Sequence, residues 1–278
     1  MRLSVALLFC LACLAAPLRA DPPAVAAAGA LPTVSLIDGW RQPDGGRVAG
    51  IVITLEPGWH TYWRVPGEAG IPPSFDWSAS RNVAAVRYEW PRPDILDSYG
   101  MRSYGYVDAL VLPVLLTPKD PAAPMDVALS LSFGICKDVC MQADRAVAAR
   151  LGPEVGPGAA GGRRQIEAAL AERAHSAAEA GIARVTCGVR PAEGGYEITA
   201  EVTFDRAPAT AQVAVFESAQ PGLWIGEAES ETEGRTVVAR APLAGAGSAG
   251  PVLERRGLRV TMLDDRRAVD IRGCAAPE

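Results

Sequence analysis

Short apolar runs separated by proline, glycine and aspartate recur along the chain and predict β-strands. In residues 127–134 an apolar residue alternates with a small or polar one, which is the two-residue period of a strand with one buried face. Comparable runs are residues 48–55, 84–90, 109–116, 127–135, 184–190, 196–204, 212–216, 235–239 and 258–263. Many short strands without alternating helices are typical of antiparallel β-sandwiches. The pattern therefore predicts a mainly β protein with two immunoglobulin-like antiparallel β-sandwich domains.

A segment rich in glycine and proline separates the two sets of strands. Residues 152–162 read Gly-Pro-Glu-Val-Gly-Pro-Gly-Ala-Ala-Gly-Gly and indicate a linker. Residues 163–180 follow, with Ile166, Leu170 and Ala174 four apart, which predicts a helix that Gly181 ends and that packs against one or both sandwiches. The predicted division is a sandwich over residues 30–151, a linker and helix over 152–181, and a second sandwich over 182–276.

The first twenty residues have the pattern of a secretory signal peptide. Arg2 precedes an apolar stretch that ends at Ala16, and Ala20 offers a small residue for cleavage. This stretch is too short to span a membrane comfortably, and no later stretch reaches that length. A lipoprotein site at Cys13 is disfavoured, because Cys10 stands where that motif needs an aliphatic residue. The sequence thus predicts a soluble, exported protein with a signal peptide over residues 1–20.

Removal of this segment would change the charge and the cysteine count. The whole chain has 27 basic and 32 acidic residues. Loss of Arg2 and Arg19 leaves 25 basic residues against 32 acidic ones, a net charge of −7. This balance argues against a nucleic-acid partner. Four of the six cysteines remain, and in an exported protein an even number indicates disulfides.

Cys136 and Cys140 form the most informative pair, since only three residues separate them. In an extended strand their Cα atoms would lie roughly 13 Å apart, whereas a disulfide needs about 4.4–6.8 Å. The pair can therefore close only across a tight turn. Such a short loop adds little stability through chain entropy. A short, constrained and exposed disulfide is of the kind that exchanges electrons, so Cys136 and Cys140 are the candidate catalytic residues.

Cys187 and Cys274 have a different setting. Cys187 falls in the first predicted strand of the second sandwich and Cys274 lies just beyond its last strand. Terminal strands of sandwiches often lie side by side, so a bridge between them is plausible on this plan. It would close a loop of nearly ninety residues, which stabilises by several kcal/mol in the loop-entropy model. We interpret this pair as a structural disulfide, and a second redox pair is the weaker alternative.

Several motifs occur in order over residues 35–150. They are residues 58–63 (Gly-Trp-His-Thr-Tyr-Trp), 65–73 (Val-Pro-Gly-Glu-Ala-Gly-Ile-Pro-Pro), 97–100 (Asp-Ser-Tyr-Gly) and 112–114 (Leu-Pro-Val), followed by Cys136 and Cys140. Together they resemble the N-terminal periplasmic domain of the DsbD family of thiol:disulfide interchange proteins, and more closely the corresponding region of ScsB. In that resemblance residues 97–100 match the loop that caps the active site.

The resemblance implies a thiol–disulfide relay in the periplasm on an immunoglobulin-like fold. Electrons would come from a thioredoxin-like donor or a DsbD-type membrane transporter and pass to disulfide-containing periplasmic client proteins. Cys140 resembles the cysteine that forms mixed disulfides, and Cys136 resembles the resolving one. Asp97 and Tyr99 resemble residues that cap or tune the site. No cofactor and no metal is implied, and activity as a protein-disulfide reductase is left open.

The chain also departs from DsbD. Its two cysteines have three residues between them where DsbD has five, which is closer to ScsB. Ser98 replaces an aromatic cap residue, so shielding is expected to be weaker or to pass to Tyr99 or Tyr104. No membrane transporter or thioredoxin domain follows, so the electron donor is expected to be another polypeptide.

Other residues near the motifs have simpler interpretations. Lys137 fits an exposed turn better than a role in lowering a thiol pKa, Asp138 would act oppositely on that pKa, and Asp94 fits a solvated loop. Six aromatic residues suit core packing better than a client-binding groove. They are Trp59, Tyr62, Trp63, Trp77, Tyr88 and Trp90.

Two other functions stay open. Paired thiols can bind copper, whereas zinc would need two further ligands and the chain has only His60 and His175. We expect His175 on the surface of the linker helix and His60 in a structural role. ScsB-like proteins are associated with copper tolerance, which implies thiol repair more readily than copper storage. The second alternative is a non-redox adaptor whose sandwiches present a docking face.

Overall fold

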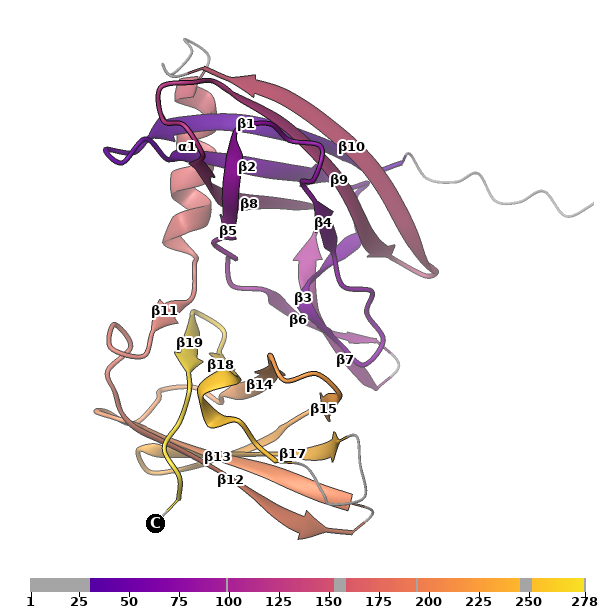
Figure 1. The fold of residues 1–278 in the computed structure, drawn as a ribbon. Helices are drawn as coiled ribbons and strands as arrows, with labels where there is room; N and C mark the ends of the chain where they lie inside the picture. The colour runs from indigo at the N-terminus through magenta and orange to yellow at the C-terminus, as the bar shows by residue number, and fades with distance from the viewer. Residues whose placement is uncertain (1–30, 99, 153–158, 194, 246–251, 278) are drawn as a thin grey trace, which may run out of the picture. The chain divides into compact units, whose positions relative to one another are not determined.

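The first sandwich is built from two antiparallel sheets, and the computed structural model describes residues 31–98, 100–152, 159–193, 195–245 and 252–277 of the chain (Figure 1). One sheet has the order β1-β2-β8-β5, and the other has the order β10-β9-β3-β7-β6, with β4 pairing to β9. Their bounds are β1 Thr33–Arg41, β2 Arg47–Thr54, β3 His60–Gly67, β4 Ser74–Asp76, β5 Val83–Tyr88, β6 Asp94–Ser98, β7 Met101–Val107, β8 Ala109–Pro118, β9 Met125–Cys136 and β10 Cys140–Leu151.

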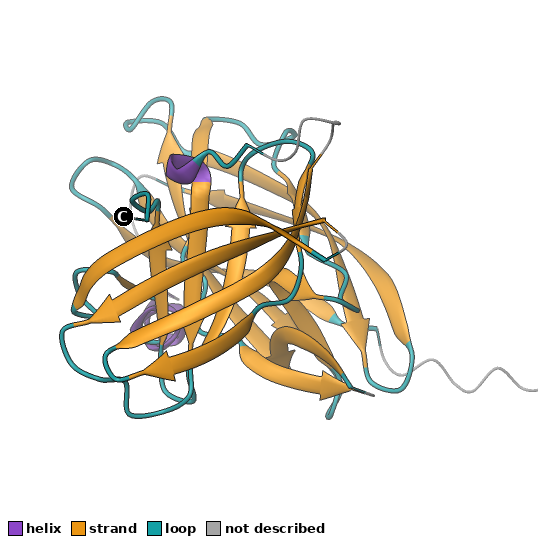
Figure 2. Cartoon of the chain, turned by 90° about the horizontal axis from the view of Figure 1, so that it is seen from below, coloured by secondary structure: helices purple, strands orange, loops and turns teal. Residues whose placement is uncertain are grey.

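The core of this sandwich follows from the alternation of apolar residues in its strands. Leu129, Leu131 and Phe133 of β9 are buried, as are Ile51 of β2 and Leu112 of β8. Facing sheets that each bury one apolar side form such a core between them. Figure 2 shows how strongly strands dominate the molecule. The predicted class, a mainly β protein with immunoglobulin-like antiparallel sandwiches, is confirmed.

The second sandwich repeats this plan with shorter strands. One sheet has the order β12-β13-β17-β15, with β16 pairing to β17, and the other has the order β11-β19-β18-β14. All pairings between these strands are antiparallel except β11 with β19. The bounds are β11 His175–Ser176, β12 Ile182–Ala192, β13 Gly195–Phe204, β14 Val213–Ser218, β15 Leu223–Ile225, β16 Glu229–Glu233, β17 Thr236–Gly245, β18 Leu258–Leu263 and β19 Ala268–Arg272, with a 3₁₀ turn over Arg255–Gly257.

The helix between the two sets of strands differs from the prediction. Helix α1 spans Ala159–Ala171, so it begins before residue 163 and ends well before residue 180. Ile166 is fully buried, and its side chain fits over Gly39 of β1 and Gly50 of β2, where a Cβ atom would lie 2.9 and 3.1 Å from it. These two glycines let the helix approach the outer face of the β1-β2-β8 sheet closely, as Figure 1 shows.

The helix ends at Ala171, and residues that follow it form contacts outside the helix. His175 and Ser176 form the short strand β11, which pairs with β19. The Glu179 carboxylate accepts hydrogen bonds from Arg173 and from the Ser176 backbone N–H. The expectation that His175 lies on the surface of a helix is therefore wrong, since it is a half-buried strand residue. The predicted signal peptide and residues 153–158 of the predicted linker lie outside the described residues.

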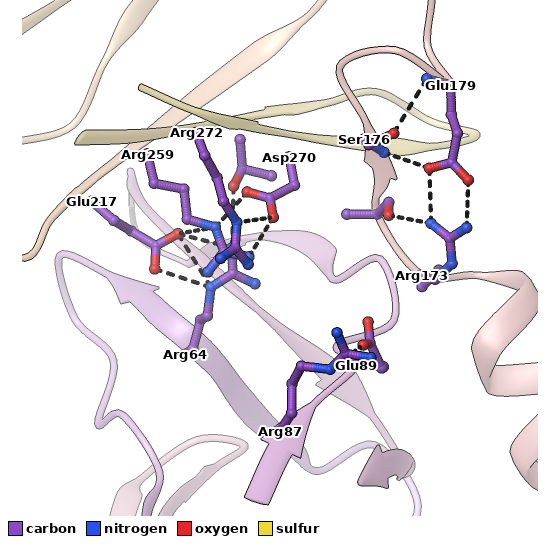
Figure 3. Close-up of polar contacts among 12 residues, drawn as sticks. Arg64, Arg87, Glu89, Arg173, Ser176, Glu179, Glu217, Arg259, Asp270 and Arg272 are labelled. Atoms are coloured by element: carbon purple, nitrogen blue, oxygen red, sulfur yellow. Dashed lines mark hydrogen bonds and ion pairs between the residues drawn. The ribbon is translucent and has the colours of Figure 1, made fainter. Parts of the chain in front are cut away.

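Ion pairs and apolar contacts join the two sandwiches. Arg64 of β3 donates to both carboxylate oxygens of Glu217 in β14, at 2.8–3.2 Å, and to the Thr261 hydroxyl at 3.2 Å (Figure 3). The Arg259 guanidinium pairs with Asp270 beside them. Three residues of the second sandwich also pack into the apolar cluster of the first, namely Val215, Leu263 and Ala268. Within the described part of the chain, no helix has the length and apolar character needed to cross a membrane.

Candidate redox site

The candidate redox pair closes the hairpin between β9 and β10. Cys136 is the last residue of β9 and Cys140 the first of β10, and a disulfide joins them with their Cα atoms 4.1 Å apart. The two residues are direct partners in the antiparallel register, so both side chains lie on one face of the hairpin. Cys136 is 7% exposed, whereas Cys140 is an exposed residue. Because Cys140 is the more exposed residue, this arrangement favours attack by a partner's thiolate on Cys140 Sγ over attack on Cys136 Sγ.

Strand β3 brings a histidine next to this pair. His60 is the direct partner of Cys136 in the β3–β9 register, and opposed residues of antiparallel strands have Cβ atoms about 4.5–5.5 Å apart. His60, Cys136 and Cys140 thus form a row across three neighbouring strands. The Thr61 hydroxyl donates to the Gly134 carbonyl at 2.8 Å and fixes this register. Desolvation by burial lowers the pKa of His60, so its imidazole is neutral at pH 7.

Tyr62, two residues along β3, reaches the sulfur of Cys140. Its hydroxyl lies 3.4 Å from Cys140 Sγ. The ring is held between two glycines, because a Cβ atom on Gly70 or on Gly134 would lie 2.8 Å from its carbon atoms. Burial raises the pKa of the Tyr62 phenol, which keeps it protonated and able to donate a hydrogen bond. The hydroxyl is therefore placed to stabilise a thiolate on Cys140 once the disulfide opens.

The turn between the cysteines is exposed and carries one apolar side chain. Val139 is 66% exposed, and Asp138 is exposed as well. The Lys137 Nζ donates to the Pro57 carbonyl at 3.2 Å, so it anchors the turn to the loop before β3. On that loop, the Gly58 N–H donates to the Asp108 carboxylate at 2.6 Å. Lys137 thus lies in an exposed turn, as the sequence predicted, and Asp138 lies in the same turn.

The residues of the expected cap have different settings. Asp97 is an exposed residue of β6, paired in register with Arg102 of β7. Tyr99 lies outside the described residues. Tyr104 is buried beside Trp63, with ring centroids 6.2 Å apart, and burial raises the pKa of Tyr104 to about 12. Tyr104 is therefore a core residue of the first sandwich.

Most of the aromatic residues singled out from the sequence line the core of the first sandwich. Trp63 is 1% exposed, and Trp59, Trp77, Tyr88 and Trp90 are partly buried against the same apolar cluster. Core packing is the role that the sequence favoured for them. Tyr62 differs, because its hydroxyl touches Cys140, and that contact was not predicted. Alternation along β3 places Tyr62 on the face of His60, but the pairing of β3 with β9 has no local sequence signal.

The second cysteine pair lies in the other sandwich. A disulfide joins Cys187 of β12 to Cys274, which follows β19, with Cα atoms 5.7 Å apart. Cys187 is 0% exposed and belongs to the apolar core. Around it, the Cys187 N–H donates to the Ala275 carbonyl at 2.9 Å and the Ala275 N–H donates to the Val185 carbonyl at 3.0 Å. The bridge therefore fixes the C-terminal segment alongside β12.

A zinc site would need more ligands than the two cysteines of this hairpin supply. Among the described residues, no group of three or more His, Cys, Asp or Glu side chains is arranged to hold a metal ion. His60 and the two cysteines share a row, but Cys136 and Cys140 are joined to each other. In this oxidised state the arrangement is suited to thiol–disulfide exchange.

Comparison with known proteins agrees with the geometry. Residues 34–151 match the family model described as "Thiol:disulfide interchange protein DsbD, N-terminal". A solved structure, the N-terminal periplasmic domain of ScsB from Proteus mirabilis, is similar with a TM-score of 0.66 and 21% sequence identity. The similarity covers 89% of this chain and 92% of that one, and it shows a shared fold. No curated protein matches the chain significantly. Residues 34–151, which hold both Cys136 and Cys140, thus form a domain of the DsbD N-terminal family of thiol:disulfide interchange proteins.

Proposed function

We propose that the protein is a periplasmic thiol–disulfide interchange protein that passes electrons through the Cys136–Cys140 pair. The donor is a thioredoxin-like protein or a DsbD-type membrane transporter, and the acceptors are periplasmic proteins with disulfides. One observation carries the proposal: a disulfide that closes a hairpin, with Cys140 an exposed residue whose Sγ lies 3.4 Å from the Tyr62 hydroxyl. Membership of residues 34–151 in the family supports it.

Reduction of the pair proceeds by two thiol–disulfide exchanges. A thiolate of the reduced donor attacks Cys140 Sγ, the Cys136–Cys140 bond breaks, and Cys136 leaves as a thiolate. The second donor thiolate then attacks its partner sulfur in the mixed disulfide and releases Cys140. The donor loses two electrons and two protons and becomes a disulfide, and this chain gains both as a dithiol.

Delivery to the client reverses these steps. The Cys140 thiolate attacks the client disulfide and one client sulfur leaves as a thiolate, which takes up a proton. Cys136 then attacks Cys140 Sγ, restores the intramolecular disulfide and releases the second client thiol. The exposure of Cys140 and the burial of Cys136 support these separate roles. Donation from the Tyr62 hydroxyl would stabilise the Cys140 thiolate before it attacks.

Trapping of mixed disulfides tests the proposal. In periplasmic extract, Cys136→Ser keeps the attacking cysteine and cannot resolve the intermediate, so it should accumulate mixed disulfides with donor and clients. Cys140→Ser should trap far less, because its one hairpin thiol is buried. The Cys136→Ser/Cys140→Ser double variant is the matched control and should trap nothing. Mass spectrometry of the trapped complexes would identify the partners.

The alternatives predict other results. If neither single variant captures a protein and Cys136–Cys140 stays oxidised against reduced thioredoxin, the redox proposal fails and the non-redox adaptor takes its place. Stoichiometric Cu(I) binding that is lost in Cys136→Ser, without any mixed disulfide, would instead support a copper-binding protein. Strong trapping by Cys140→Ser and none by Cys136→Ser would reverse the two cysteine roles.

A further inference from the structure

An apolar cavity lies where the end of β3 meets β14 and β15. It has a volume of about 130 Å³, roughly ten times what a single water molecule needs. Its apolar walls come from both sandwiches and include Val65, Pro66, Phe216, Trp224 and Ile225. A cavity of this size and lining can take one bulky apolar side chain.

Trp224 forms an exposed wall of this cavity. It is 60% exposed, which is a large exposure for a tryptophan in a short paired strand. Its position is fixed, because Trp224 pairs with Ala244 of β17 and its ring lies over Gly226, where a Cβ atom would come within 2.8 Å of the indole. Rigid exposed aromatic residues beside a pocket are the usual anchors of protein interfaces.

The neighbouring groove is acidic. Glu68 and Glu227 line both the cavity and this groove, and Glu229 lines the groove alone. Arg102 pairs with Glu227 at 3.0 Å, but Glu68 and Glu229 make no ion pair within the described ranges. Burial raises the pKa of Glu227. The negative charges of Glu68 and Asp97 raise it further, whereas the positive charge of Arg102 lowers it. The groove therefore has an excess of negative charge next to an apolar cavity.

We propose that this cavity and groove bind an extended polypeptide segment of a partner protein, in which a bulky apolar side chain stands next to Lys or Arg. The apolar side chain fills the cavity against Trp224, and the basic group meets Glu68 and Glu229. The cavity also lies within reach of the redox hairpin, because Val65 is five residues along β3 from His60, at most about 17 Å. Binding itself does not depend on redox activity.

Peptide binding tests this proposal on the full mature chain. The protein carries Cys136→Ser and Cys140→Ser, so the result is independent of thiol exchange and does not bear on the proposed function. The probe is a fluorescein-labelled, end-blocked peptide, Gly-Ser-Phe-Lys-Ser-Gly, followed by fluorescence anisotropy. We expect saturable binding that weakens at 0.5 M salt. Replacing the peptide's Phe with Ser, or its Lys with Glu, should weaken binding several-fold.

Variants of the protein locate the site. Trp224→Ala should weaken binding at least about tenfold, as for an aromatic anchor. Circular dichroism of this variant separates the loss of the anchor from misfolding. Glu68→Gln should weaken binding about threefold, as for an exposed ion pair. Glu193→Gln makes the same charge change on the β12–β13 turn and should leave binding unchanged. Absence of binding, equal binding by Trp224→Ala, or equal affinity for the Glu peptide would each overturn the proposal.

Discussion

The two disulfides of this chain have opposite settings. Cys136–Cys140 spans four residues at the tip of a hairpin and exposes Cys140. Cys187–Cys274 spans 87 residues, and Cys187 lies in the core of the second sandwich. In the loop-entropy model, the stabilisation grows with the length of the closed loop, whereas exchange depends on access to a sulfur atom. Cys136–Cys140 is therefore the more accessible bridge, and Cys187–Cys274 is the bridge expected to contribute more to stability.

The neighbours of each bridge agree with this division. β10 is an edge strand of its sheet, and among the described residues no strand pairs with it on the side away from β9. Tyr62 adds a polar group to that sulfur at 3.4 Å. Cys187 has apolar neighbours instead, including Ile198 and Ala200 of β13. The two disulfide bonds therefore differ in the position of their strands within the sheets and in the burial of their cysteines.

The largest expected difference is in the rate of reduction. In native protein, reduced thioredoxin or dilute dithiothreitol should open Cys136–Cys140 about 10³-fold faster than Cys187–Cys274, if exposing Cys187 by local unfolding costs about 4 kcal/mol. Timed alkylation and mass spectrometry of peptides would measure both rates. In 6 M guanidinium the ratio should fall close to one, which is the control for access. Similar rates in native protein would contradict the division of roles.

The next difference is in stability. Cys187→Ala/Cys274→Ala should lower the free energy of unfolding by about 4–5 kcal/mol, and Cys136→Ala/Cys140→Ala by about 2 kcal/mol, because the closed loops differ so much in length. Urea unfolding followed by circular dichroism would measure both double variants against the oxidised wild type. A hairpin variant that loses as much stability as the other would show that Cys136–Cys140 also has a structural role.

Much of the fold could be predicted because its central strands carry their own signal. In β9, Leu129, Leu131 and Phe133 alternate with small or polar residues, and the buried face follows directly. Strand β3 was missed, since its sequence His-Thr-Tyr-Trp-Arg-Val-Pro-Gly has no clear alternation and contains proline. The predicted helix extended nine residues past the observed end at Ala171, because the Arg173–Glu179 pair and the pairing of β11 with β19 come from contacts that local spacing does not encode.

The candidate site was predictable only in part. The spacing of Cys136 and Cys140 predicted a pair across a tight turn, because chain geometry alone limits what such a pair can do. The neighbours of the pair depend on the order of strands in the sheet. Since β3 lies beside β9, His60 faces Cys136 and Tyr62 reaches Cys140, although more than seventy residues separate these partners in the chain.

The smallest expected difference is in the pKa of one thiol. In the reduced protein, donation from the Tyr62 hydroxyl stabilises the Cys140 thiolate, so Tyr62→Phe should raise the pKa of Cys140 by about one unit, the equivalent of one hydrogen bond to a charged group. Burial keeps the Tyr62 phenol protonated over this range by raising its pKa.

The pH dependence of Cys140 alkylation by iodoacetamide in a Cys136→Ser background would measure this shift, since only the thiolate reacts. The midpoint should move to higher pH in Tyr62→Phe, so that at a pH below both midpoints alkylation becomes about tenfold slower. Tyr196→Phe, which removes a hydroxyl in the second sandwich, should leave the midpoint unchanged. An unchanged midpoint in Tyr62→Phe would mean that the two bridges differ through exposure and loop length alone, without tuning of the Cys140 thiolate.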